Sequence, residues 1–145
     1  MKTIILIITF LCSVFCYGQT FYVNNLNGTK WQRVGIEGWS STWEFSKSEI
    51  KYVSSNHPTQ DEHNLYRTNP YYISKTIPNS FDESKINSTT KGKYIVVKTK
   101  NGNIRVYRID YLSSDSLKLF YIHNESPMIG IGGVTTDYIF DRINK

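Results

Sequence analysis

The stretch from residue 93 to residue 122 constrains the fold of this chain more than any other. It contains three short runs rich in β-branched and aromatic residues, at 93–99, 103–110 and 117–122. Such residues suit the pleated surface of a sheet. Asn101-Gly102 separates the first two runs and is the strongest short-range hairpin signal, because both central residues of a type I′ turn need a positive φ. The stretch therefore predicts a three-strand antiparallel meander.

The pairing across this predicted hairpin indicates which face lies inside. A two-residue turn at 101–102 sets Ile95 opposite Arg108 on one face, and Lys98 opposite Arg105 on the other. Like charges directly opposite each other are unfavourable, so we expect the second face to be solvated. The same reasoning predicts that Arg108 lies inside, near one end of the core.

The rest of the chain repeats this pattern of short strands. Further runs with strand-like alternation lie between turns rich in Gly, Asn and Pro, and no segment with a 3.6-residue period is long enough to predict a helix. These runs are 31–36, 42–46, 49–53, 71–76 and 137–143. The expected fold is all-β, an antiparallel up-and-down meander closed into a barrel of about eight strands. The connections at 56–70 and 77–92 are expected to be long loops, the second tethered by Phe81 and Ile86.

The N-terminus has the features of an export signal. Basic Met1-Lys2 precedes an apolar run at 3–15, and Gly18 supplies a small residue before Gln19. We expect cleavage after Gly18, so that residues 1–18 form a signal peptide and the mature protein is periplasmic or secreted. The apolar run is shorter than the roughly 20 residues of a membrane span. Neither cysteine of this segment follows the small residue that a lipobox needs, so lipidation is not expected.

Composition excludes several classes of function. Both cysteines lie in the predicted signal, so the mature domain has no disulfide and no thiol nucleophile. Removal of Lys2 leaves 16 of the 17 basic residues against 12 acidic ones. The basic residues are scattered, and this distribution predicts neither a nucleic-acid partner nor a polybasic lipid-binding segment. We expect a monomer.

Several segments together resemble one family. These are the Leu26–Trp31 stretch, the Trp43–Ser46 stretch, residues 71–81, the meander at 93–122, and a last strand that carries Arg142. In this respect the chain resembles bacterial lipocalin-like proteins of the calycin type. The resemblance implies that residues 19–145 form one lipocalin-like barrel with a binding role.

The resemblance also implies one structural contact and shows two departures. In lipocalins an Arg near the end of the barrel covers a Trp of the first strand, and Trp31 and Arg142 are the matching positions. An Arg over an indole is a favourable arrangement. The lipocalin Gly-x-Trp is one residue longer here, as Gly28-Thr-Lys-Trp31, and no helix follows the last strand.

Aromatic residues point to a ligand. Three Trp and eleven Tyr are many for 145 residues, and an eight-stranded barrel has an interior just large enough to be filled or to hold one small molecule. Trp43, Phe45 and Tyr121 are expected to line such a cavity, with Arg108 anchoring an anionic head group. The expected function is non-catalytic binding of a small hydrophobic or amphipathic ligand.

Other functions have weaker support in the sequence. The His57–His63 loop gathers two His and two carboxylates, but their spacing matches no metal site, and a solvated loop explains them. No nucleophile elbow, zinc-protease motif or phosphate-binding loop is present. We therefore expect no enzyme activity, cofactor or metal. The alternative to ligand binding is an envelope or secreted protein-binding module, an inhibitor or accessory protein, that uses loops 56–70 and 77–92.

Overall fold

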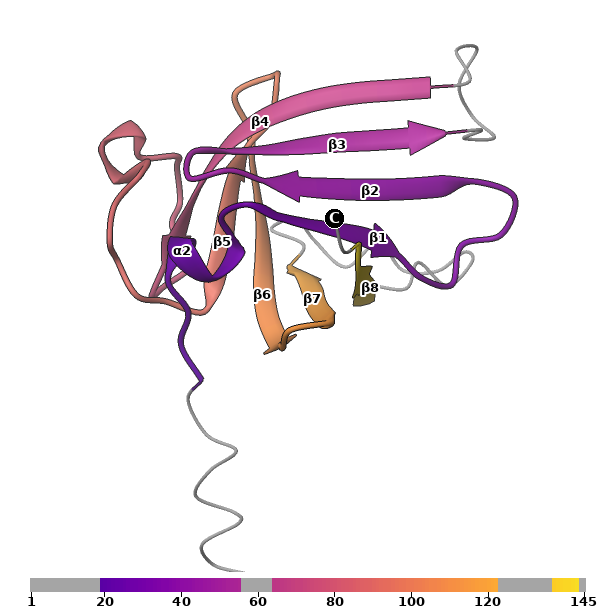
Figure 1. The fold of residues 1–145 in the computed structure, drawn as a ribbon. Coiled ribbons are helices and arrows are strands. Elements are labelled where there is room, and N and C mark those ends of the chain that lie inside the picture. The colour runs from indigo at the N-terminus through magenta and orange to yellow at the C-terminus, as the bar shows by residue number, and fades with distance from the viewer. Residues whose placement is uncertain (1–18, 56–63, 123–136, 144–145) are drawn as a thin grey trace, which may run out of the picture.

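The strands of this chain close into a single antiparallel barrel in which each strand pairs with the next and β8 returns to β1. The computed structural model describes residues 19–55, 64–122 and 137–143 (Figure 1). The strands are β1 (Thr29–Arg33), β2 (Ser40–Phe45), β3 (Glu49–Ser55), β4 (Asn64–Ser74), β5 (Tyr94–Lys98), β6 (Ile104–Leu112), β7 (Ser116–Ile122) and β8 (Asp137–Arg142). The predicted all-β up-and-down barrel of eight strands is confirmed.

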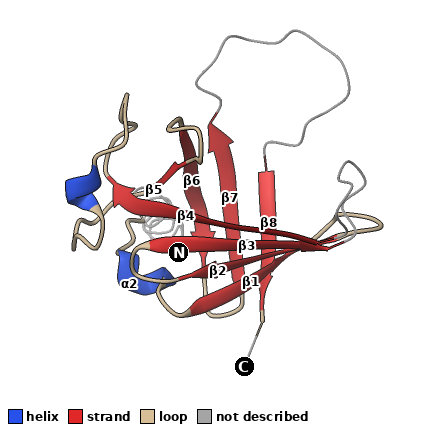
Figure 2. Cartoon of the chain, turned by 90° about the horizontal axis from the view of Figure 1, so that it is seen from above, coloured by secondary structure: helices blue, strands red, loops and turns tan. Residues whose placement is uncertain are grey.

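Two short helical turns accompany the barrel (Figure 2). They are α2 (Val23–Leu26) and the 3-10 turn η1 (Glu83–Lys85). Neither helix of the described segments has the length and apolar character needed to cross a membrane. The predicted signal peptide at 1–18 and the His57–His63 loop lie outside the described residues.

The β5–β6 hairpin differs from its predicted register by one residue. The N–H of Thr99 donates to the carbonyl of Asn103 at 2.8 Å, which leaves three residues, 100–102, in the loop. Gly102 has a φ of +83°, whereas Asn101 does not take a positive φ. This geometry is typical of a type I turn followed by a left-handed glycine, not of the type I′ turn that Asn-Gly predicts.

The change in register exchanges the faces of β6. Val97 pairs with Arg105, and Tyr94 pairs with Arg108. Because side chains alternate along a strand, a shift of one residue turns each of them to the other face of the sheet. Arg105 thus points into the barrel, and the prediction that Arg108 points inward was wrong.

Arg108 lies on the outer surface. Its side chain is 41% exposed, and its Nε donates to Oδ1 of Asp110 at 2.5 Å. The guanidinium carbon also lies 4.7 Å from the centre of the Phe120 ring. Arg108 is therefore an exposed, ion-paired residue on the outside of the wall.

One end of the barrel is closed by a fully buried tryptophan. The indole Nε1 of Trp31 donates to Oγ1 of Thr29 at 2.7 Å, and that hydroxyl donates to the carbonyl of Leu26 in α2. Arg142 pairs with Trp31 in the β1–β8 ladder and lies over its ring at 5.7 Å. Its Nη1 donates to the carbonyl of Ser114 at 3.0 Å. The contact between Trp31 and Arg142 that the family resemblance implies is therefore present.

The segment before β1 is held against the same end by Gly92. Phe21 and Gly92 exchange two backbone hydrogen bonds, of 2.7 and 2.9 Å. A Cβ atom on Gly92 would lie 2.1 Å from the carbonyl oxygen of Ser74. No side chain fits in that space, so only glycine allows β4 and the N-terminal segment to approach this closely.

Strand β4 begins earlier than predicted. Residues 64–70, expected as the end of a loop, pair with β3, and residues 71–74 pair with β5. The strand was missed because the inward positions Arg67 and Asn69 are polar, so the alternation of apolar residues is lost. β5 ends at Lys98, and the wall opens between the first half of β4 and the tip of the β5–β6 hairpin. In Figure 1, β2, β3 and this half of β4 extend together past β5.

The loop from 77 to 92 covers the outer face of β4 and β5. Tyr72 and Val96 point outward but are only 1% and 0% exposed. The Phe81 ring lies 5.1 Å from the Tyr72 ring, and Lys98 forms an ion pair with Glu83. Phe81 thus tethers the loop to the barrel, as expected from the sequence.

Candidate functional site

The interior of the barrel has two halves of different character. In the closed half most inward side chains are apolar and buried, and they include Trp31, Phe45, Ile50, Tyr71, Ile109, Leu117 and Phe140. In the other half, here called the open half, the inward positions whose side chains the structure describes are aromatic or polar. By the strand registers these are Arg33, Ser41, Tyr52, Ser54, Arg67, Asn69, Arg105, Tyr107, Tyr121 and Tyr138.

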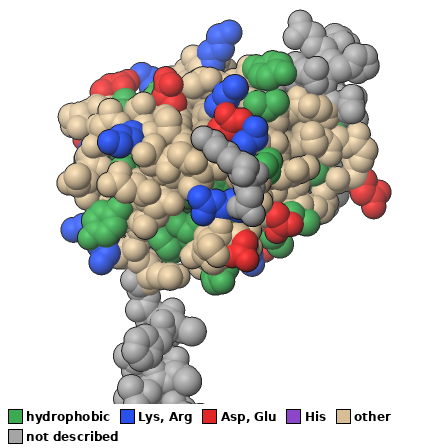
Figure 3. Space-filling view, viewed as in Figure 1, with side chains coloured by type: hydrophobic (Ala, Val, Ile, Leu, Met, Phe, Trp, Pro, Cys, Tyr) green, Lys and Arg blue, Asp and Glu red, His purple; other side chains and the backbone are tan. Residues whose placement is uncertain are grey.

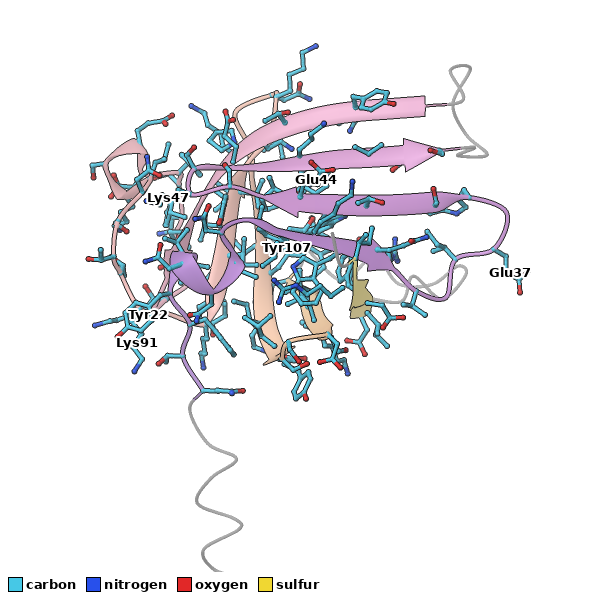
Figure 4. All side chains as sticks on the ribbon, viewed as in Figure 1. Tyr22, Glu37, Glu44, Lys47, Lys91 and Tyr107 are labelled. Atoms are coloured by element: carbon cyan, nitrogen blue, oxygen red, sulfur yellow. The ribbon has the colours of Figure 1, made fainter. Side chains whose placement is uncertain are left out.

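An aromatic cluster forms the floor of the open half. It consists of Trp43, Tyr52, Tyr107, Tyr121 and Tyr138, from five different strands. The Trp43 ring lies 4.7 Å from Tyr52, 5.3 Å from Tyr107 and 5.9 Å from Tyr138. The Tyr121 ring lies 5.2 Å from that of Tyr107, tilted by 39°, and Figure 4 shows Tyr107 within the barrel. The rings meet mainly edge to face, the arrangement that aromatic pairs prefer.

Two phenols of this cluster, those of Tyr52 and Tyr107, have raised pKa values and remain protonated at neutral pH. Burial raises the pKa of Tyr52 well above its ordinary value and Tyr107 adds to the effect, whereas Arg105 and a hydrogen bond with Asn69 oppose it. Burial likewise raises the pKa of Tyr107, and Arg105 again opposes it. The two hydroxyls are therefore hydrogen-bonding groups beside a fixed positive charge, and not nucleophiles or bases.

A hollow of about 1170 Å³ lies where the wall opens. The first half of β4, residues 79–81 of the loop, the β5–β6 hairpin and the end of β7 line it. Four of the lining residues are cationic, namely Arg67, Lys98, Lys100 and Arg105, and none of the described residues that line it is an Asp or Glu. Tyr121 brings the aromatic cluster to the edge of the hollow.

A further arginine closes the opposite side of the open half. The guanidinium carbon of Arg33 lies 4.1 Å from the centre of the Tyr138 ring and 5.9 Å from that of Trp39. Stacking of this kind holds a cation in place without a carboxylate. The aromatic cluster thus has a guanidinium on two sides, Arg33 from β1 and Arg105 from β6.

The sequence-predicted ligand residues do not all meet at one place. Trp43 lies at the centre of the aromatic cluster, and Tyr121 lines the hollow. Phe45 packs on Tyr71 in the filled half, at a ring distance of 5.7 Å. Arg108 is outside.

The sequence reasoning missed the residues that surround Trp43 and Tyr121. The register error turned Arg105 and Tyr107 to the wrong face, and Arg67 fell in a predicted loop. Residues 66–70 contain only one aromatic residue, Tyr66, so no period-two pattern marks them as a strand.

On the face seen in Figure 3, Lys and Arg side chains are interspersed with Asp and Glu. Within the described segments no three His, Cys, Asp or Glu side chains gather in a way that could hold a metal ion. What the open half can do chemically is bind, through ring faces, phenol hydroxyls and arginine.

Comparison with known proteins adds no relative. Neither the protein-family models, nor the curated proteins, nor the solved structures contain a match to this chain.

Proposed function

We propose that this chain is an exported, lipocalin-like binding protein that holds a small hydrophobic or amphipathic molecule without covalent chemistry. The observation that carries the proposal is the contrast between the two halves of the barrel. The closed half is filled by side chains, whereas a hollow of about 1170 Å³ adjoins the aromatic cluster of the open half. The ligand site is placed in the open half.

The size and lining of the hollow support a small ligand. Sites for small molecules are concave, of roughly 300–1000 Å³ when closed, and combine apolar walls with a few placed polar groups. Tyr121, Ile104 and Ile122 offer the apolar part of the wall, and Asn69 and Arg105 are among the polar groups that line it. The hollow is open on one side, so one end of the ligand remains near solvent.

Two features support the lipocalin-like assignment and the export. Arg142 over Trp31 closes one end of the barrel, as in the family that the sequence resembles. Basic Met1-Lys2 and the apolar run at 3–15 predict secretion.

Native mass spectrometry of the protein purified from its own host tests the proposal. The expected result is a retained mass of a few hundred daltons that is released by mild denaturation. The variant Tyr121→Ala should lose the retained mass, and Phe45→Leu, a change in the filled half, should keep it. A protein that carries no small molecule and captures a specific envelope protein would instead favour the protein-binding alternative.

A further inference from the structure

We propose that the ligand carries an oxyanion head group, which sits in the opening between β4 and the β5–β6 hairpin, and that Arg105 determines this specificity. The inference rests on the proposed function and names the chemical class of the ligand. A carboxylate and a phosphate ester share the chemistry that an arginine fork recognises.

The charge of the opening favours an anion. Of its four cations, Lys98 forms an ion pair with Glu83 of the covering loop. For Arg67, Lys100 and Arg105, the described part of the chain supplies no carboxylate within ion-pair distance. These three cations line the same hollow, whose described lining contains no Asp or Glu, so their charges repel each other and an anionic ligand removes this repulsion.

Arg105 is the cation best placed to hold the head group. It lies opposite Val97 on the inner face of the hairpin, at the boundary between the solvent-filled opening and the buried rings. Its charge acts on both Tyr52 and Tyr107. The guanidinium fork therefore lies beside the aromatic cluster, and Arg67 on β4 lines the opening from the other side.

The arrangement also gives the ligand a direction. The head group lies at the opening, and the apolar part extends over Tyr121, the ring of the aromatic cluster that lines the hollow. The filled half beneath Trp43 limits how deep that part can reach. The expected ligand is thus an anionic amphipath with a short apolar portion.

A series of amphipaths with one tail and different head groups tests this inference. Octanoate, octyl phosphate, octyl maltoside and octyltrimethylammonium are titrated below their critical micelle concentrations, with tryptophan fluorescence as the readout. The two anions should bind roughly tenfold or more tightly than the neutral and cationic members, which corresponds to one charge-assisted hydrogen-bonded contact. The relative affinity of the carboxylate and the phosphate identifies the source of the oxyanion.

Variants of Arg105 test its role, and a variant of Arg108 on the same strand is the matched control. Arg105→Met should remove the preference for anions, and Arg105→Lys, which keeps the charge but loses the fork, should restore part of it. Arg108→Met changes the same residue type three positions along the same strand, but on the outer face, and should leave the affinities unchanged. Circular dichroism of each variant confirms that the barrel is intact.

The outcomes separate the two proposals. If no member of the series binds, the proposed function fails. If all four head groups bind equally, or if Arg108→Met removes the preference as much as Arg105→Met does, ligand binding stands but the assignment of an oxyanion to Arg105 is overturned.

Discussion

Thr29 makes the closure of the barrel testable, because one hydroxyl serves two buried groups. It accepts a hydrogen bond from the Trp31 indole at 2.7 Å and donates one to the carbonyl of Leu26. Thr29 is 7% exposed, and both of its partners are 0% exposed. Neither partner can form a hydrogen bond with water instead when the hydroxyl is removed. The perturbation is Thr29→Val, which keeps the shape of the side chain, compared with Thr29→Ser, which keeps the hydroxyl.

Which of the two variants is the more stable depends on whether hydrogen bonds or burial of apolar area dominate at this site. Thr29→Val leaves a buried N–H and a buried C=O without partners, at about 1–3 kcal/mol each; shared relaxation reduces the sum to about 2–4 kcal/mol. Thr29→Ser removes one buried methyl group, at about 1 kcal/mol. If burial of apolar area alone mattered, valine would be the more stable variant. The hydrogen bonds therefore predict that serine is more stable than valine by about 1–3 kcal/mol.

Equilibrium unfolding in urea at neutral pH measures this difference, with unchanged m-values as the check that both variants unfold from the same fold. Thermal scans should show the valine variant melting lower by about 4 °C for each kcal/mol. Thr42→Val, on the outer face of the adjacent strand β2, is the control and should lie within about 0.5 kcal/mol of the unchanged protein. If Thr29→Val is as stable as Thr29→Ser, the hydroxyl does not stabilise this end of the barrel and the reasoning is refuted.

Three further predictions concern other contacts. Gly92→Ala should lower the free energy of unfolding by about 1–3 kcal/mol or more, because its Cβ would lie 2.1 Å from a backbone oxygen; an unchanged urea midpoint would contradict this. Tyr71→Phe should cost about 1 kcal/mol, since the Tyr71 hydroxyl donates to the carbonyl of Ser46 at 2.7 Å; calorimetry that shows no loss would argue against the bond. Burial raises the folded-state pKa of Tyr52 and Tyr107 above the unfolded value near 10. Stability should therefore be independent of this pair below about pH 10 and fall above it as the unfolded chain releases protons; a flat profile to pH 11, in unfolding followed by circular dichroism, would contradict the assignment.

The number and order of strands could be predicted because they depend on local sequence patterns. Alternation in the Trp43 strand and in the meander, with Gly and Asn turns between them, indicates short antiparallel strands wherever they lie in space. The covering of Trp31 by Arg142 depends on two residues more than 100 positions apart, and only the resemblance to a family linked them. The first half of β4 could not be predicted, because its inward residues Arg67 and Asn69 face a solvent-filled opening and need not be apolar.

The sequence predicted the type of side chain at the candidate site but not which arginine occupies it. An inward arginine beside Trp43 and Tyr121 was expected, and an inward arginine is present, but it is Arg105 and not Arg108. The two arginines are three positions apart on β6, so their side chains point to opposite faces of the sheet. Asn-Gly is compatible with a two-residue or a three-residue loop, and the choice between them decides which arginine points inward.

The repulsion between Lys98 and Arg105 explains which loop forms. In a two-residue hairpin these cations lie directly opposite each other, and the prediction assumed that solvent would accept this pair. The three-residue loop removes the conflict, because Lys98 then lies on the outer face, where Glu83 pairs with it, and Arg105 lies opposite Val97 on the inner face. The same shift places Ile95 opposite Tyr107, an apolar pair within the core. A single extra loop residue, accommodated by the positive φ of Gly102, thus separates two cations, completes the core and delivers Arg105 to the opening where we place the head group.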